Sequence, residues 1–198
     1  MFQLARMNSG RNSAHWRPLT IAGLIGLALL AVLALGGPAR ALAAPCPHAN
    51  DAIDEATAKQ HAAAIVCLIG KDRAQRDLHA LDRSSKLDAA AGRHNRTMLK
   101  KDCWEHDCPG EPGLGGRIRD TGYLNGVRSW TYAENFGCAA TPRGMLEGWL
   151  SKAFSRWNIR EKVFRDVGTA AARDQVGASQ CDDGNEITFT VVFAQRRG

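Results

Sequence analysis

The sequence predicts an α+β fold in which an antiparallel sheet is covered by helices. Three observations support this fold class. Helical periodicity fills the first part of the chain after residue 43, the alternating apolar residues typical of strands come mostly late, and the connections are too short and too few for repeated βαβ units. We therefore expect helices on both faces of the sheet.

Two helices are expected at the start of the domain. The first covers residues 51–76, where Ile65 and Leu68 follow helical spacing. Ser84 or Ser85 is a suitable capping residue for the second helix. The side chains on the inner face of this second helix fall within a band of about 100° on a helical wheel: Leu87, Ala90, Ala91, His94 and Met98.

The middle of the chain combines a loop with a further helix. Glycine and proline dominate residues 109–126, which predicts a loop apart from a helical patch at 116–121. A short strand is expected at 129–132. Thr141 followed by Pro142 is a strong helix start, because the hydroxyl caps the helix and proline suits the first helical position. The buried face of this helix consists of Met145, Leu146, Trp149, Leu150 and Ala153.

Two more strands are expected near the carboxyl end. Residues 167–172 follow an irregular stretch and form the first of them. Residues 186–195 form the second, because their side chains alternate regularly between two faces. One face carries Ile187, Phe189, Val191 and Phe193, and the other carries Thr188, Thr190 and Val192.

The first 43 residues have the layout of a secretory signal peptide. Arg6, Arg11 and Arg17 precede an uncharged apolar run over 19–37, and small residues favour cleavage after Ala43. The protein is therefore expected to be secreted. The alternative is that the apolar run is retained as a membrane anchor, since its length approaches that of the shortest spanning helices. A membrane partner is expected only in that case.

Export changes the charge balance of the protein. Residues 1–43 contain four of the 26 basic residues and no acidic one, so the exported part has 22 basic and 20 acidic residues, a net charge of +2. The two kinds of charge are also interspersed along the chain. This pattern excludes nucleic acid as an expected partner, because nucleic-acid-binding proteins carry a basic stripe or patch.

All six cysteines lie after residue 43, so they are expected to form disulfides in an oxidising compartment. The preferred pairs are Cys46–Cys67, Cys103–Cys108 and Cys138–Cys181, although the spacing leaves other connectivities open. The stretch "CWEHDCPGE" at 103–111 also raises the alternative of a zinc site. A disulfide is favoured there, because no second cysteine pair has the spacing of zinc ligands.

Four segments occur in an order and spacing that is specific. They are "LDAAAGRHNRTM" (87–98), "GGRIRDTGY" (115–123), "AENFGC" (133–138) and "GWLSKAFSRWNIREKVFRDVG" (148–168). In these segments the chain resembles the bacterial secreted branch of the CAP superfamily, which groups cysteine-rich secretory proteins, insect antigen 5 and plant pathogenesis-related proteins. The similarity runs from Val66 to Phe193. With the signal peptide at 1–43, the expected organisation is an extension with the start of the first helix at 44–65 and a CAP (SCP-like) domain at 66–198.

The resemblance implies a three-layer α-β-α sandwich with a central antiparallel sheet, stapled by disulfides, and a central cleft. In the family this cleft commonly holds two histidines and one or two acids. By position, the first histidine is His106 and the acid is Glu134 of "AENF". Ser155 stands where the second histidine belongs, and Lys152 stands where animal members carry a second glutamate.

Some members of the family bind a divalent metal in the cleft, which makes His106 and Glu134 the candidate metal ligands. No cofactor is expected beyond a weakly held divalent cation such as zinc, because only these two donors remain at the matched positions. Glu105, Asp107 or water would have to complete the shell. Lys152 nearby would make a cation less favourable still.

His106 and Glu134 have two interpretations. In the first, the carboxylate fixes the imidazole tautomer and raises its basicity, so that His106 acts as a general base. In the second, the pair only pins the 103–111 loop to the sheet. Ser155 would add the third part of a hydrolase triad, but the sequence has no G-x-S-x-G nucleophile elbow. His94 shares an apolar helix face, which favours a core role over a ligand role.

The favoured function is a secreted, non-enzymatic binding module for an apolar ligand, an envelope component or a protein. Lipid binding is known for relatives and enters only through the resemblance. Exposure of Trp130 and Trp157 would suit a lipid-binding or glycan-binding face. The alternative is a hydrolase or metal-assisted enzyme centred on His106 and Glu134, with Ser155 in place of the second histidine. A third alternative is a degenerate member with an inert cleft.

Overall fold

A computed structural model describes residues 44–173, 181 and 185–198. The expected signal peptide at 1–43, its cleavage after Ala43 and the alternative of a retained anchor lie outside these residues. Within the described part of the chain, no helix combines the length and apolarity needed to cross a membrane.

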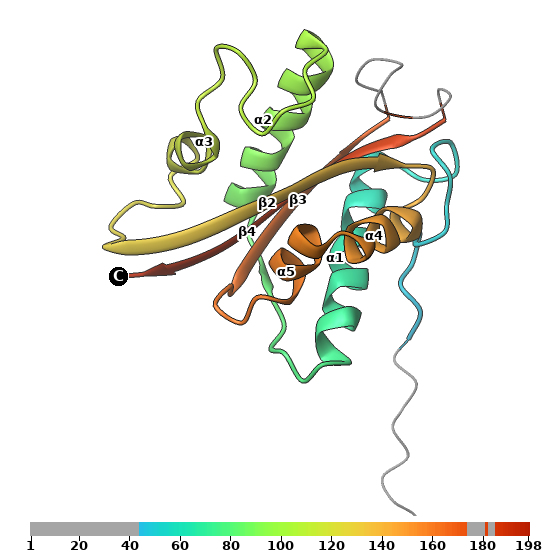
Figure 1. Ribbon diagram of the computed structural model, residues 1–198, viewed down its shortest axis with the longest axis horizontal. Coiled ribbons are helices and arrows are strands. Elements are labelled where there is room, and N and C mark those ends of the chain that lie inside the picture. The colour runs from blue at the N-terminus through green and yellow to red at the C-terminus, as the bar shows by residue number, and fades with distance from the viewer. Residues whose placement is uncertain (1–43, 174–180, 182–184) are drawn as a thin grey trace, which may run out of the picture. The chain divides into compact units, whose positions relative to one another are not determined.

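The described residues form five helices and four strands (Figure 1). The helices are α1 (Ala58–Ala74), α2 (Ser85–Lys101), α3 (Leu114–Asp120), α4 (Pro142–Ser151) and α5 (Ala153–Arg160). The strands are β1 (Asp82–Arg83), β2 (Ser129–Ala139), β3 (Asp166–Ala172) and β4 (Ile187–Arg197). Helices and strands are mixed as an α+β fold requires.

The strands form one sheet in the order β1-β3-β4-β2. The long strand β4 lies between β3 and β2 and is antiparallel to both. The two-residue strand β1 pairs parallel with β3 at the edge. The sheet is therefore antiparallel in its three long strands, as expected, with one short parallel pair added.

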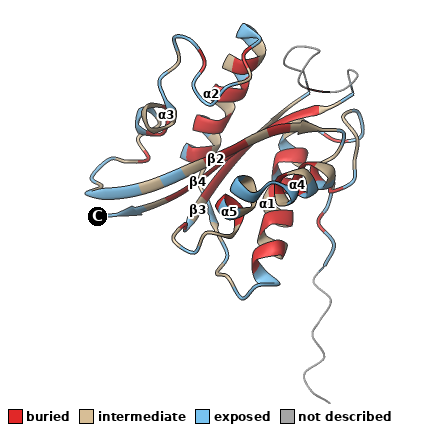
Figure 2. Cartoon of the chain, in the orientation of Figure 1, coloured by how far each residue is buried: buried red, intermediate tan, exposed pale blue. Residues whose placement is uncertain are grey.

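Helices cover both faces of the sheet and produce three layers (Figure 1). On one face, α1, α4 and α5 pack on a core that includes Phe189, Val191 and Phe193 of β4. On the other face, α2 and α3 pack on Val192 and Ala194. Both faces of β4 are thus buried (Figure 2), and each fully buried large apolar side chain contributes roughly 1.5–3 kcal/mol.

One glycine permits the contact between α2 and the sheet. Gly168 of β3 lies against the backbone of Leu87 and Asp88, and a Cβ atom at position 168 would overlap these backbone atoms. The same contact is completed by the Asp88 carboxylate, which accepts a 2.8 Å hydrogen bond from the backbone N–H of Thr169. Because of this close approach, α2 is fixed firmly over the sheet, with His94 facing inward.

Several expected elements differ from the structure. Ala153, expected on the buried face of the helix that starts at Thr141, belongs to α5 and is exposed. The first helix begins at Ala58 and not at residue 51, because Thr57 and Gln60 form a capping box that starts the helix there. Strand β2 extends to Ala139, well beyond the expected end at residue 132. Helix α5 lies in the stretch that was expected to be irregular. By contrast, Thr141 caps α4 as expected and accepts a 3.1 Å hydrogen bond from Gly144.

Three disulfides staple the domain: Cys46–Cys67, Cys103–Cys108 and Cys138–Cys181. They are the three pairs preferred from the sequence. The first ties the segment before α1 to that helix, and the third ties the end of β2 to the segment before β4. The second closes a short ring that carries His106. The first and third, which join residues 21 and 43 positions apart, stabilise the fold mainly by restricting the unfolded chain.

Burial of a neutral histidine makes stability depend on pH. His61 of α1 is fully buried, and neither ring nitrogen has a hydrogen-bond partner. Removal from water lowers the pKa of His61 below its usual 6.5. The unfolded chain takes up the proton at higher pH than the folded chain, so this stability is complete above about pH 6.5 and is lost as pH falls towards the lowered pKa.

We therefore expect the free energy of unfolding to decrease between about pH 7 and pH 5, and to decrease less in the His61→Leu variant. Urea unfolding at a series of pH values measures both curves. The leucine introduces no ionisable group. Parallel curves for the two proteins would contradict the assignment of the pH dependence to His61.

Candidate functional site

His106 and Glu134 meet directly in the structure. The Nδ1 atom of His106 lies 2.9 Å from Oε1 of Glu134, at hydrogen-bond distance. The two side chains differ in exposure, since 54% of the His106 side chain is accessible and only 1% of the Glu134 side chain. No described residue bonds to Nε2 of His106. The pair therefore has a buried carboxylate that orients an imidazole open to solvent.

A small ring of the chain positions His106. The Cys103–Cys108 disulfide closes this ring, and both cysteines are buried. Phe136 of β2 lies beneath it, with its ring centroid 4.7 Å from that of His106 and 5.1 Å from that of Trp104, both edge-on. The disulfide and the aromatic contacts together hold the imidazole against the sheet.

Arg117 of α3 connects the ring to the sheet. Its side chain is 1% exposed, and Nη2 donates a 2.7 Å hydrogen bond to Oε2 of Glu134. Nη1 donates a 2.8 Å hydrogen bond to the backbone carbonyl of His106. Nη1 also lies 3.3 Å from Oε2 of Glu111. The buried guanidinium group of Arg117 thus contacts the carboxylates of Glu111 and Glu134 and the backbone of His106.

His94 of α2 completes the arrangement. Its side chain is fully buried, and Nδ1 lies 2.8 Å from Oε2 of Glu111. Its Nε2 atom lies 3.7 Å from Oε1 of Glu134 and has no hydrogen-bond partner. Oε1 of Glu111 also has no hydrogen-bond partner. We refer to His94, His106, Glu111, Arg117 and Glu134 as the polar cluster.

The formal charges of the polar cluster do not cancel. Counted formally, the carboxylates of Glu111 and Glu134 and the guanidinium group of Arg117 sum to one negative charge. His94 is a core histidine, as expected from its helix face, but its ring contacts carboxylates and not only apolar side chains. Sequence reasoning missed Glu111 and Arg117. The only signal for them was their place in the quoted segments "CPGE" and "GGRIRD".

Successive residues of β2 face opposite sides of the sheet. Glu134 pairs with Val192 of β4, which belongs to the core beneath α2 and α3. Asn135 pairs with Val191, which belongs to the core beneath α1, α4 and α5. The side chain of Asn135 therefore lies on the other side of the sheet from the Glu134 carboxylate.

Ser155 and Lys152 belong to that other side. The backbone carbonyl of Ser155 accepts a 3.0 Å hydrogen bond from the Asn135 side chain. Lys152 is exposed and separates α4 from α5. Within the described residues, no hydrogen bond or ion pair joins the side chain of Ser155 or Lys152 to His106 or Glu134. That these residues share one cleft stays a prediction.

The described residues do not present a set of donors that suits zinc. Two groups of potential ligand atoms lie within 4.8 Å of one another: His94, Cys108 and Glu111, and Cys138, Cys181 and Glu186. Each group includes at least one disulfide-bonded cysteine, whose sulfur is not a thiolate ligand. His106 belongs to neither group.

The surroundings of Glu134 also disfavour a cation. Arg117 bonds to one of its carboxylate oxygens and brings a positive charge to the place where a metal would bind. Glu105 and Asp107, which would have to complete a shell with His106, are exposed. Asp107 lies 3.7 Å from Arg117. We derive no metal-dependent step from this arrangement.

A separate surface carries exposed aromatic side chains. On α5, 69% of Phe154 and 54% of Trp157 are accessible to solvent. The two side chains share one face of the helix, because they are three positions apart. Trp157 makes an edge-on contact with the buried Phe164, with the ring centroids 6.5 Å apart. Trp130 and Tyr132 of β2 are also exposed. We refer to Phe154 and Trp157 as the α5 aromatic pair.

Comparison with protein families gives one match. Residues 68–193 match the model of the cysteine-rich secretory protein family, CAP. This range includes the polar cluster and the α5 aromatic pair. None of the curated proteins compared with the sequence matches it.

Two of the solved structures similar to this chain illustrate the shared fold. An outer surface protein from Borrelia burgdorferi is 15% identical, with a TM-score of 0.55 over 67% of this chain and 90% of that chain. An extracellular protein with an SCP domain from Bacillus anthracis is 20% identical, with a TM-score of 0.54 over 70% of this chain and 43% of that chain. At these identities the similarity shows the fold.

Arg117→Ala is expected to lower the free energy of unfolding by about 3–5 kcal/mol, because the buried carboxylates of Glu111 and Glu134 would lose their cation. Arg119→Ala is the matched control on the same helix. Arg119 is exposed, so its loss is expected to change stability by no more than about 0.5 kcal/mol. Urea unfolding measures both values. Equal midpoints for the two variants would contradict a stabilising role for Arg117.

Proposed function

Because the chain belongs to the cysteine-rich secretory protein (CAP) family, we propose that it is an exported binding domain that contacts a lipid surface of the cell envelope. Three features support the location: the signal layout at 1–43, the pairing of all six cysteines, and neighbours described as outer surface or extracellular proteins. The contact is assigned to the exported domain and does not require a retained anchor.

The observation that carries this proposal is the exposure of the α5 aromatic pair. A phenylalanine that is 69% exposed and a tryptophan that is 54% exposed leave a large apolar area in water. Both extend from one short helix, so they reach the same surface. Aromatic side chains that are exposed together are typical of binding sites, and tryptophan is favoured at the boundary between lipid and water.

The charges around α5 suit an anionic lipid surface. Lys152 precedes the helix, and Lys162 and Arg165 follow it, all three exposed. Arg160, at the end of the helix, is bonded to Asp72 and contributes less free charge. An apolar group surrounded by lysine and arginine is the usual composition of a protein surface that binds anionic lipid headgroups while it inserts its aromatic rings.

A second candidate function, general base catalysis by His106, is favoured by one observation. The imidazole of His106 is half exposed and is held through Nδ1 by a buried carboxylate, an arrangement suited to general base catalysis. Such an enzyme would have to activate water, because the described contacts include no hydrogen bond between His106 and the Ser155 hydroxyl. Within the described residues we identify no serine or cysteine nucleophile beside His106, so binding remains the preferred function.

Substitution of both members of the α5 aromatic pair by alanine is expected to weaken binding to vesicles by about tenfold or more, because each ring would lose its contact with lipid. The vesicles contain phosphatidylcholine and phosphatidylglycerol, and sedimentation measures the bound fraction. Trp130→Ala is the matched control, since it removes an exposed aromatic ring from β2. We expect it to change binding by less than about twofold.

Two results of that experiment would reject the proposal. The first is the absence of vesicle binding by the unmodified protein. The second is an equal loss of binding in the control and in the Phe154→Ala/Trp157→Ala variant, since this would show that the position of the rings does not matter.

His106→Ala separates the two candidate functions. We expect this variant to bind vesicles within about twofold of the unmodified protein, because His106 lies away from α5. We also expect the unmodified protein to hydrolyse p-nitrophenyl acetate no faster than the variant does. A rate that falls about a hundredfold or more in His106→Ala would instead support the enzymatic function.

A further inference from the structure

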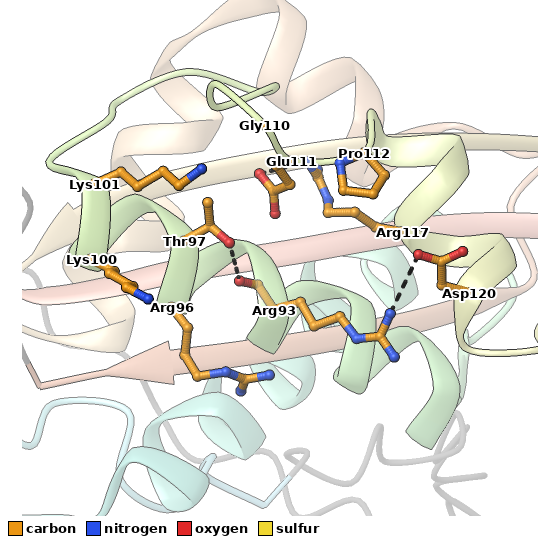
Figure 3. Close-up of a pocket in the computed structure, with 10 residues that line it drawn as sticks. All are labelled: Arg93, Arg96, Thr97, Lys100, Lys101, Gly110, Glu111, Pro112, Arg117 and Asp120. Atoms are coloured by element: carbon orange, nitrogen blue, oxygen red, sulfur yellow. Dashed lines mark hydrogen bonds and ion pairs between the residues drawn. The ribbon is translucent and has the colours of Figure 1, made fainter.

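A basic pocket lies between α2 and the segment that leads into α3 (Figure 3). Its volume is about 430 Å³. Helix α2 contributes Arg93, Arg96, Lys100 and Lys101, and α3 contributes Arg117. Two acidic side chains also line it, which leaves a formal net charge of +3 in a protein domain whose overall charge is nearly balanced.

The two acidic side chains of the pocket are already paired. Glu111 is bonded to His94 and lies 3.3 Å from Arg117. Asp120 lies 3.6 Å from Arg93 across the pocket, as the dashed line in Figure 3 shows. Neither carboxylate is therefore available to neutralise the remaining cations of the pocket.

Arg96 and Lys100 are the cations that remain. Both are exposed, and neither has a hydrogen bond or ion pair with any residue in the described ranges. Lys101 differs, because its ammonium group donates to the backbone carbonyl of Pro109 and holds the loop over the pocket. Two uncompensated charges at the wall of a concave site favour binding of an anion.

The loop over the pocket has a defined shape. Gly110 adopts a left-handed conformation with φ of 72°, which most other residues would adopt only with strain. The Cys103–Cys108 disulfide and the contacts of Glu111 fix the chain on either side of it. The pocket is consequently preformed, which reduces the entropy cost of binding.

From these features we propose that the pocket binds a phosphate-bearing ligand. A phosphate monoester carries close to two negative charges at neutral pH, which matches the excess positive charge better than a carboxylate does. A guanidinium group such as that of Arg96 can bind two phosphate oxygens at once. The volume falls in the range of small-molecule sites, about 300–1,000 Å³, and the basic residues form a pocket and not the long stripe that nucleic acid requires.

This pocket is separate from the surface in the proposed function. It lies over the α2 and α3 face of the sheet, whereas the α5 aromatic pair lies over the opposite face. The phosphate group has two sources: a soluble phosphorylated compound or the headgroup of a phospholipid. Phosphate binding in this pocket therefore does not depend on the lipid contact at α5.

The first arm of the test uses inorganic pyrophosphate and isothermal titration calorimetry. We expect saturable binding that weakens about tenfold or more in Arg96→Gln/Lys100→Gln, because two charged contacts are lost. Lys59→Gln/Arg128→Gln is the matched control. It removes the same charge from two exposed residues outside the pocket, and we expect its affinity to stay within about twofold.

The second arm uses vesicles that contain phosphatidic acid, whose headgroup is a phosphate monoester, and proteins that also carry Phe154→Ala and Trp157→Ala, so that contact through α5 is removed. Pyrophosphate binding that depends on Arg96 and Lys100 indicates a soluble ligand. Vesicle binding with the same dependence, in the absence of pyrophosphate binding, indicates a phospholipid headgroup. The proposal is overturned if neither probe binds, or if the pocket variant and the control variant lose affinity equally.

Discussion

A buried guanidinium group must find its hydrogen-bond partners within the protein, and Arg117 finds them on three separate parts of the chain. It bonds to Glu134 on β2, to the backbone of His106 in the disulfide ring, and to Glu111 in the loop before α3. The position of each part is therefore tied to the others. Arg117 therefore contributes both to the orientation of His106 and to the position of the loop over the basic pocket.

Side chains of β2 alternate between the two faces of the sheet, and each face supports a different functional surface. Glu134 faces α2 and α3, where the polar cluster and the basic pocket lie. Asn135 faces α5 and bonds to Ser155 and Asn158, which fixes the helix that carries the exposed aromatic rings. Adjacent residues of one strand thus support two different surfaces, one polar and concave and the other apolar and exposed.

Local signals in the sequence were sufficient for most of the fold. Thr141 and Pro142 marked the start of α4, the regular alternation of 187–193 marked β4, and four quoted segments indicated the CAP family, which the family match confirms.

The site was harder to predict, because it depends on tertiary contacts. The burial of Arg117 follows from where α3 packs, which the segment "GGRIRD" alone does not indicate. Ser155 was assigned to the site by matched position, and among the described residues its side chain has no hydrogen bond to His106 or Glu134. His94 was assigned to the core correctly, but its carboxylate partners come from distant segments.

The account depends most on the energetic coupling between Arg117 and Glu134, which a double-mutant cycle measures directly. The cycle compares the free energies of unfolding of Arg117→Met, Glu134→Gln and the double variant with that of the unmodified protein. We expect a coupling energy of about 2 kcal/mol or more, because either single substitution leaves a buried polar group without its partner. Effects of the two substitutions that add to within about 0.5 kcal/mol would contradict the account.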